Sequence, residues 1–240
     1  LENCVTIATD LDWETDRIAA AGVLGLLHDV GRFPQFQKYH TLVDSQSVDH
    51  GELGRKIVSD LFLLSSSGPA ERSDIMCAIC HHNKRDLPAG AGPGALALLK
   101  LVRDADKLDI IRTLNELLRT DGFSRYPELL LNVDQYGPAN PSLIDDIACC
   151  RPGSYSKVKS LADMQLMQLS WIYDLNYPTT FHLLISRGLL AAIKQRLPDA
   201  EGVDRITVAA EKYAVKQAGL SRVSLASDHE SSAADRRISP

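Results

Sequence analysis

The segment from Gly94 to Thr120 constrains the fold most strongly, because it combines a helical pattern of apolar residues with a run of aspartates. Apolar residues recur there at the three- and four-residue spacing of one helix face: Leu98, Leu101, Val102, Ala105, Leu108 and Ile111. This spacing predicts a long amphipathic helix that buries one face. The sequence therefore calls for further helices to cover that face.

Three aspartates interrupt this predicted helix, although aspartate is a poor residue for helix interiors. Asp106 follows Val102 by four positions, so we expect its carboxylate near the buried face. A carboxylate near the core needs a compensating cation, and a metal ion can supply one. We expect Asp104 and Asp109 on the solvated face instead.

Helical periodicity also dominates the rest of the chain, which predicts an all-α fold. We expect a first helix running through residues 18–27, ended by Gly31 and Pro34, and an ordered loop over 35–47. A short hairpin is predicted near 133–137, and the polar residues after 220 are expected to be a disordered tail. Further helices are expected at residues 49–61, 70–82, 143–150, 157–175, 179–197 and 203–219.

Composition excludes several functional classes. The formal net charge is −5, so no global basic field would attract long nucleic acid or an anionic membrane. Charges interrupt every apolar stretch well before the ~18 residues that a membrane span needs. Five cysteines in 240 residues do not form the pattern of a disulfide scaffold. We therefore expect a cytoplasmic protein with reduced thiols.

Four short segments contain the imidazoles and carboxylates that bind divalent cations. Each segment alone has an ordinary structural explanation, such as a surface histidine or a solvated helix face, so the argument depends on their order and spacing. The segments are His28-Asp29, Asp49-His50-Gly51-Glu52, His81-His82-Asn83-Lys84 and Arg103-Asp104-Ala105-Asp106-Lys107-Leu108-Asp109.

This order resembles the HD-domain superfamily of metal-dependent phosphohydrolases, over residues 1–120 and more weakly to about 197. The resemblance implies an HD-like helical bundle with additional C-terminal helices. By this resemblance, His28, Asp29 and Asp106 would bind a first metal ion. His50 and His82 match the positions that hold a second ion in some branches, with Asp29 bridging the two.

The same resemblance implies that metal-activated water hydrolyses a phosphomonoester or phosphodiester, with a nucleotide as the expected small-molecule substrate. The catalytic residues would be Asp29, Arg32 and Lys107, and the phosphate would be bound by Arg32, Lys84, Arg85 and Lys107. Mixed imidazole and carboxylate ligands favour Mn, Fe, Ni, Co or Zn over Mg. We expect an HD-type domain over 1–197, with its metal core in 1–120 and a helical extension over 121–197. A separate C-terminal helix would cover 198–219.

The sequence departs from the family pattern in two places. The Gly-Tyr-Pro element of the HD-GYP cyclic-dinucleotide phosphodiesterases is missing after His82, so that substrate class is unsupported. The family's first histidine should precede His28 by about one helix, yet no histidine occurs in residues 1–27. We expect this ligand to precede Leu1, because residues 1–5 resemble the continuation of its helix. If the protein lacks it, the first metal site loses a ligand.

Two alternatives remain open. Cys77-Ala78-Ile79-Cys80-His81 matches the Cys-x-x-Cys-His pattern for covalent c-type haem attachment. Cysteines buried in a helix are the simpler explanation of that pattern. The second alternative is a regulatory or binding module that keeps the HD fold without catalysis.

Overall fold

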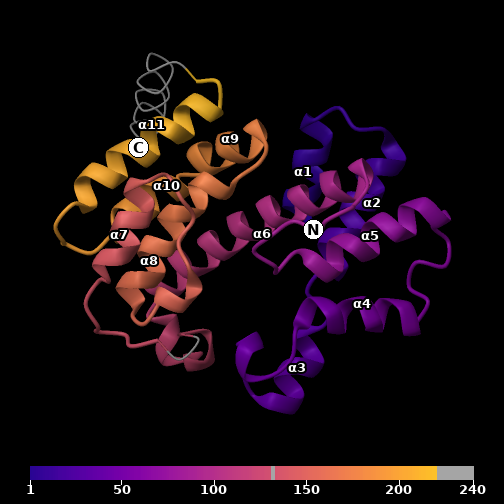
Figure 1. Cartoon of the computed structure of the whole chain (residues 1–240), viewed down its shortest axis with the longest axis horizontal. Helices are drawn as coiled ribbons and strands as arrows, with labels where there is room; N and C mark the ends of the chain where they lie inside the picture. The colour runs from indigo at the N-terminus through magenta and orange to yellow at the C-terminus, as the bar shows by residue number, and fades with distance from the viewer. Residues whose placement is uncertain (131–132, 221–240) are drawn as a thin grey trace, which may run out of the picture.

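The computed structural model describes residues 1–130 and 133–220, and this part of the chain is all-α, as predicted. Its longest element is α6, which spans Pro93–Arg119 and confirms the helix predicted for 94–120. Helix α6 runs through the middle of the molecule, with the N-terminal helices on one side and the C-terminal helices on the other (Figure 1). Both sets of helices therefore meet along one central element.

The N-terminal helices form the half of the molecule that contains three of the four predicted metal segments. Helix α5 packs against α6 and α4, and α1 packs against α2 and α6. A short 3₁₀ turn, η1 (Asp44–Gln46), lies between α3 and α4. The helices of this half are α1 (Glu2–Asp10), α2 (Thr15–Leu27), α3 (Arg32–Tyr39), α4 (His50–Asp60) and α5 (Pro69–His81).

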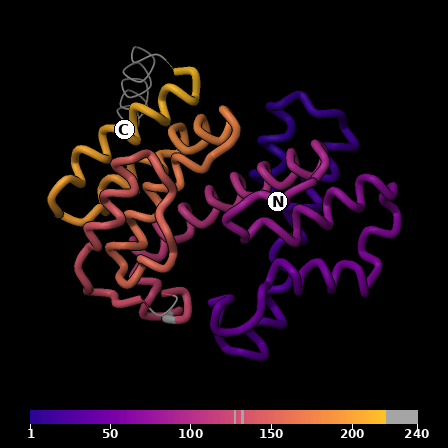
Figure 2. Tube along the Cα trace, in the orientation of Figure 1, coloured from indigo at the N-terminus to yellow at the C-terminus, as the bar shows by residue number. Residues whose placement is uncertain are grey.

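The C-terminal half is a second group of shorter helices around the other end of α6 (Figure 2). Helices α9 and α10 pack directly on α6, and α11 packs on α7 and α9. The helices are α7 (Pro141–Ala148), α8 (Leu161–Ser170), α9 (Pro178–Ser186), α10 (Leu189–Lys194) and α11 (Val203–Gln217). The 3₁₀ turns are η2 (Gly122–Ser124), η3 (Pro127–Leu130), η4 (Tyr155–Lys157) and η5 (Trp171–Asp174).

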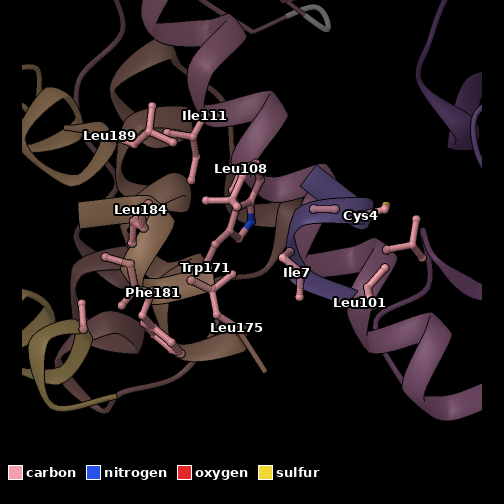
Figure 3. Packing of buried hydrophobic residues seen from close by; sticks show 14 of the residues in the cluster. Cys4, Ile7, Leu101, Leu108, Ile111, Trp171, Leu175, Phe181, Leu184 and Leu189 are labelled. Atoms are coloured by element: carbon pink, nitrogen blue, oxygen red, sulfur yellow. The ribbon is translucent and has the colours of Figure 1, made fainter. Parts of the chain in front are cut away.

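One hydrophobic core joins the two halves through α6. Leu101 of α6 lies beside α1, which contributes Cys4 and Ile7 (Figure 3). Leu108 lies farther along α6, near Trp171 and the helices α9 and α10. Because α6 is covered on both sides, the polar residues on its covered faces must either find partners or face a site.

The segment after His28 differs from the prediction. Residues predicted as a loop over 35–47 begin inside α3, which starts at Arg32. Pro34 does not end a helix there, because it occupies the first turn of α3, where a missing N–H costs no hydrogen bond. The preceding helix α2 ends at Leu27, before the Gly31 and Pro34 that were predicted to end it.

Two predicted long helices in the C-terminal half are divided. The helix expected over 179–197 breaks between α9 and α10 at Gly188, whose φ of +69° ends the helical path. The helix expected over 157–175 starts only at Leu161, because Ser160 and Asp163 form a capping box there. It then tightens into the 3₁₀ turn η5.

The hairpin predicted near 133–137 is also wrong. Asp134 makes an isolated parallel bridge to Ser160, with its N–H donating to the carbonyl oxygen of Lys159 at 2.8 Å. The predicted tail after residue 220 lies outside the described residues. Among the described helices, none combines the length and apolar character needed to cross a bilayer.

Candidate metal centre

The three histidines of the candidate centre lie at helix ends. His28 follows the last residue of α2, His50 is the first residue of α4, and His82 follows the last residue of α5. The predicted cap at Asp49 is confirmed, because its carboxylate accepts a hydrogen bond from the backbone N–H of Glu52 at 3.1 Å. The ends of three helices therefore set the backbone positions of the three histidines.

Each of these imidazoles has an oxygen acceptor at Nδ1. The carbonyl oxygen of Gly25 lies 3.1 Å from His28 Nδ1, and that of Ile79 lies 2.8 Å from His82 Nδ1. The carboxylate of Asp44 lies 2.7 Å from His50 Nδ1. An acceptor at Nδ1 favours the tautomer in which Nε2 keeps its lone pair, which is how metal-binding histidines are oriented.

The three Nε2 atoms converge on Asp29. His50 Nε2 and His82 Nε2 each lie 3.3 Å from Asp29 Oδ1, and they are 3.0 Å from each other. His28 Nε2 lies 3.7 Å from the other carboxylate oxygen, Oδ2. The two oxygens of Asp29 thus face different histidines, which is the arrangement expected of a carboxylate that bridges two ions.

Asp106 completes the cluster from the middle of α6, with Oδ1 at 3.6 Å from His28 Nε2. Its side chain is 26% exposed, so it lies at the edge of the core, near the buried face as predicted. His28 Nε2 is buried without a hydrogen-bond partner. An orphaned imidazole nitrogen among two carboxylates is the donor set that a divalent cation satisfies. Asp29, His28 and His82 together already meet the geometric requirement for an ion.

The charges of the cluster stabilise one another. Burial alone would raise the pKa of Asp29, but the imidazoles of His50 and His82, each 3.3 Å away, hold it far below its usual value. Burial would likewise lower the pKa of His28, but the Asp106 carboxylate, 3.6 Å from Nε2, raises it overall. The cluster therefore keeps Asp29 ionised, as metal ligation requires.

Two glycines allow the ligand-bearing helices to approach each other. A Cβ at Gly31 would collide with the backbone carbonyl oxygen of His50. A Cβ at Gly51 would lie 2.7 Å from Asn83 Oδ1 and 2.8 Å from the carbonyl oxygen of Cys80. The turn after Asp29 and the start of α4 can approach only because these positions lack side chains.

Three of the four cations predicted to bind phosphate pair with carboxylates in this structure. Arg32 Nη1 donates to Asp44 Oδ1 at 3.1 Å, and Lys107 Nζ lies 2.9 Å from Asp174 Oδ2. Lys84 forms an ion pair with Asp49. The fourth cation, Arg85, is exposed. Arg32 and Lys107 lie next to the cluster in sequence, but their roles in catalysis and phosphate binding stay predictions.

The prediction for Asp104 is wrong, whereas Asp109 is exposed as expected. Asp104 is fully buried and accepts hydrogen bonds from the backbone N–H groups of Asn176 and Tyr177, at 2.9 and 3.0 Å. The Thr180 hydroxyl donates to it at 2.7 Å. The physical reason is that the C-terminal helices cover this face of α6, which periodicity in residues 94–120 alone could not reveal.

Sequence reasoning missed the carboxylate that supports His50. Asp44 lies six residues before His50 in the segment predicted as a loop, and no residue spacing indicates a contact over that distance. Gln35 is fully buried and Asn83 is half-buried, and both donate to Asp44, at 2.8 and 2.9 Å. A buried glutamine next to a predicted metal motif is a signal that only the structure reveals.

The Cys77-x-x-Cys80-His81 motif lies on α5 and its C-terminal end. Both cysteines are free and partly buried, and burial raises the pKa of the Cys77 thiol. The His81 Nδ1 lies 3.0 Å from the carbonyl oxygen of Cys77, one turn back on the same helix. The motif therefore has a local structural explanation, and haem attachment stays an alternative that Soret absorbance would test.

A cavity of about 400 Å³ lies beside the cluster. His28, Asp29 and Asp106 form part of its wall, and α1 and α6 form much of the rest. Arg187, which follows the last residue of α9, also lines it and donates to Asn3 Oδ1 at 2.6 Å. The candidate centre thus opens onto a space in which a small molecule can lie.

Comparison with known families agrees with this geometry. The family model of the HD domain matches residues 1–111. This match supports membership of the segment in the HD-domain superfamily. The match ends within α6, after Asp106, so it includes every residue of the His/Asp cluster. The HD family consists mostly of hydrolases, and its members typically bind divalent metal ions. No curated protein and no solved structure matches the chain.

Proposed function

We propose that this HD protein is a metal-dependent phosphohydrolase that acts on a phosphomonoester or phosphodiester, with a nucleotide as the expected substrate. The observation that supports this most is the convergence of three Nε2 atoms on the two oxygens of Asp29. Each of these imidazoles also has a hydrogen-bond acceptor at Nδ1, the ring nitrogen on the other side from Nε2, and this contact orients the ring. Such preorganisation is typical of metal ligands.

In this proposal, two sets of residues hold the metal. His28, Asp106 and Asp29 would hold one ion, and His50, His82 and Asp29 would hold a second. A divalent ion supplies a Lewis acid that activates water and neutralises charge on the phosphoryl oxygens. Imidazole and carboxylate donors favour Mn, Fe, Co, Ni or Zn over Mg.

The other residues orient the substrate and balance charge. Lys107 shares Asp174 with Arg103, whose Nη2 lies 2.9 Å from the same carboxylate oxygen. Lys107 can therefore turn to a phosphate while the buried Arg103 keeps Asp174 neutralised. Arg32, whose Nε lies 3.6 Å from Asp29 Oδ1, is placed to contact a phosphoryl oxygen at the centre. The free cysteines support our proposal of a reducing, cytoplasmic location.

The test is a panel of nucleotides and generic phosphate esters, assayed with Mn²⁺, Co²⁺, Ni²⁺ and Zn²⁺. We expect hydrolysis by the wild-type protein and at least a 100-fold lower rate for Asp106→Ala. Glu116→Ala is the matched control, because Glu116 is exposed on the same helix and does not line the cavity beside the cluster. Metal binding without turnover on any substrate would favour the non-catalytic module instead.

A further inference from the structure

Asp44, which is not one of the proposed metal ligands, forms hydrogen bonds with several residues around the candidate centre. Asp44 Oδ1 accepts from Arg32 Nη1 at 3.1 Å and from Gln35 Nε2 at 2.8 Å. Asp44 Oδ2 accepts from Asn83 Nδ2 at 2.9 Å and lies 2.7 Å from His50 Nδ1. Four side chains from three parts of the chain thus meet at one carboxylate.

The donors are neighbours of the proposed metal ligands. Arg32 follows Asp29 by three residues, and its side chain lies against both Asp29 and Asp44. Asn83 directly follows His82, and its Nδ2 also donates to Asp49 at 3.0 Å, the residue before His50. Asp44 is therefore connected to the segments that carry Asp29, His50 and His82.

We propose that Asp44 is the positioning residue of this centre, whose carboxylate fixes the His50 ring for metal binding. This inference rests on the proposed metal centre. The Asp44 carboxylate holds a proton on His50 Nδ1 and directs the Nε2 lone pair toward Asp29. A carboxylate behind a ligating histidine restricts ring rotation and makes the nitrogen a stronger donor.

The same contacts make residues 40–48 part of the centre. Gln35 Nε2 also donates to the Ser47 hydroxyl at 2.9 Å and to the Val48 carbonyl at 3.1 Å. Arg32 Nη1 donates to the Leu42 carbonyl at 2.6 Å. Movement of this segment would carry Asp44 away from His50, so the order of the segment and metal affinity are linked.

The experiment measures Zn²⁺ affinity by competition with a chromophoric chelator. We expect Asp44→Ala to weaken the ion held by His50 and His82 about 10- to 100-fold. The ion held by His28 and Asp106 should be bound as in the wild type. Asp44→Asn, which keeps the size and one acceptor oxygen, should show a smaller loss. Circular dichroism of the metal-free variants checks that each one folds.

Two controls separate this role from general effects on the loop. Thr41→Ala removes a hydroxyl that accepts only from the Val43 N–H in the same segment, at 3.2 Å. Asp60→Ala removes an exposed carboxylate at the end of α4 that pairs with Lys56. Both variants should bind Zn²⁺ as the wild type does. A loss in Thr41→Ala as large as that in Asp44→Ala would overturn the specific role.

A second readout follows the His50 proton directly. In Zn²⁺-loaded protein labelled with ¹⁵N-histidine, we expect a slowly exchanging Nδ1–H on His50, and fast exchange in Asp44→Ala. Zn²⁺ affinities and exchange rates equal to the wild type in folded Asp44→Ala would refute the proposal while leaving the phosphohydrolase function intact. Conversely, normal Asp44 results with no hydrolysis would refute only that function.

Discussion

Asp104 and Asp106 lie two residues apart on α6, yet they face opposite halves of the molecule. They also differ in burial and in hydrogen bonding. Asp104 is fully buried against α9 and accepts hydrogen bonds from Asn176, Tyr177 and Thr180. Asp106 is 26% exposed, and His28 Nε2, at 3.6 Å, is itself buried without a hydrogen-bond partner. Asp104 thus has its hydrogen-bond partners within the protein, whereas Asp106 faces an imidazole nitrogen that has no hydrogen-bond partner.

This difference separates a structural carboxylate from a candidate ligand. A buried carboxylate with several donors stabilises the fold and has no capacity left for an ion. Beside Asp106, the buried imidazole nitrogen of His28 has no hydrogen-bond partner. A buried polar atom without a partner costs free energy unless a ligand such as a metal ion binds there. The contrast predicts that Asp104 governs stability and that Asp106 governs metal binding.

The largest expected effect on stability comes from Asp104→Ala. Removing this carboxylate leaves the buried Thr180 hydroxyl and the N–H donors of Asn176 and Tyr177 unsatisfied, which should lower the free energy of unfolding by about 2–5 kcal/mol. Asp106→Ala in the metal-free protein should lower it by less than about 1 kcal/mol. Urea denaturation of both variants measures this difference. Equal losses of unfolding free energy in the two variants would contradict the distinction between Asp104 and Asp106.

Gly31→Ala should have an intermediate effect on stability, and it should disturb the half of the molecule that contains the proposed metal ligands. The new methyl group would collide with the backbone of α4 at His50, so we expect a loss of about 1–3 kcal/mol in unfolding free energy. Zn²⁺ affinity should fall as well, because α4 must move. Gly68→Ala is the matched control, since nothing lies within 4 Å of a Cβ there. Wild-type Zn²⁺ affinity in Gly31→Ala would show that close approach of α4 is unnecessary.

The smallest effect is the pH dependence of the metal-free protein. Burial lowers the pKa of His28, but the nearby Asp106 carboxylate outweighs burial and raises the pKa above its ordinary value of 6.5. The stability from this pair is therefore fully present below about pH 6.5 and is lost as pH rises through the folded-state pKa. Unfolding free energies between pH 5.5 and 9 should decline accordingly. Asp106→Asn should flatten this decline, and an unchanged slope would argue against the His28–Asp106 pairing.

The sequence predicted the N-terminal half better than the C-terminal half. Periodicity located α6 within one residue at each end, and the HD-type motifs selected the five residues that the structure brings together. The state of Asp104 could not be predicted, because its partners lie more than 70 residues away in sequence. The role of Asp44 was missed because α3 and η1 place it, and neither element has a strong apolar pattern. The break at Gly188 was missed because apolar residues continue on both sides of it.

The most direct test of the account is the metal content of the purified protein, measured by elemental mass spectrometry after incubation with Mn²⁺ or Zn²⁺ and gel filtration. The account predicts one or two divalent ions per chain in the wild type. Asp29→Asn keeps the size of the central side chain but removes its charge, and should retain less than a tenth of that metal. A wild-type protein without bound metal, or an Asp29→Asn protein with undiminished metal, would contradict the assignment of this cluster as a metal centre.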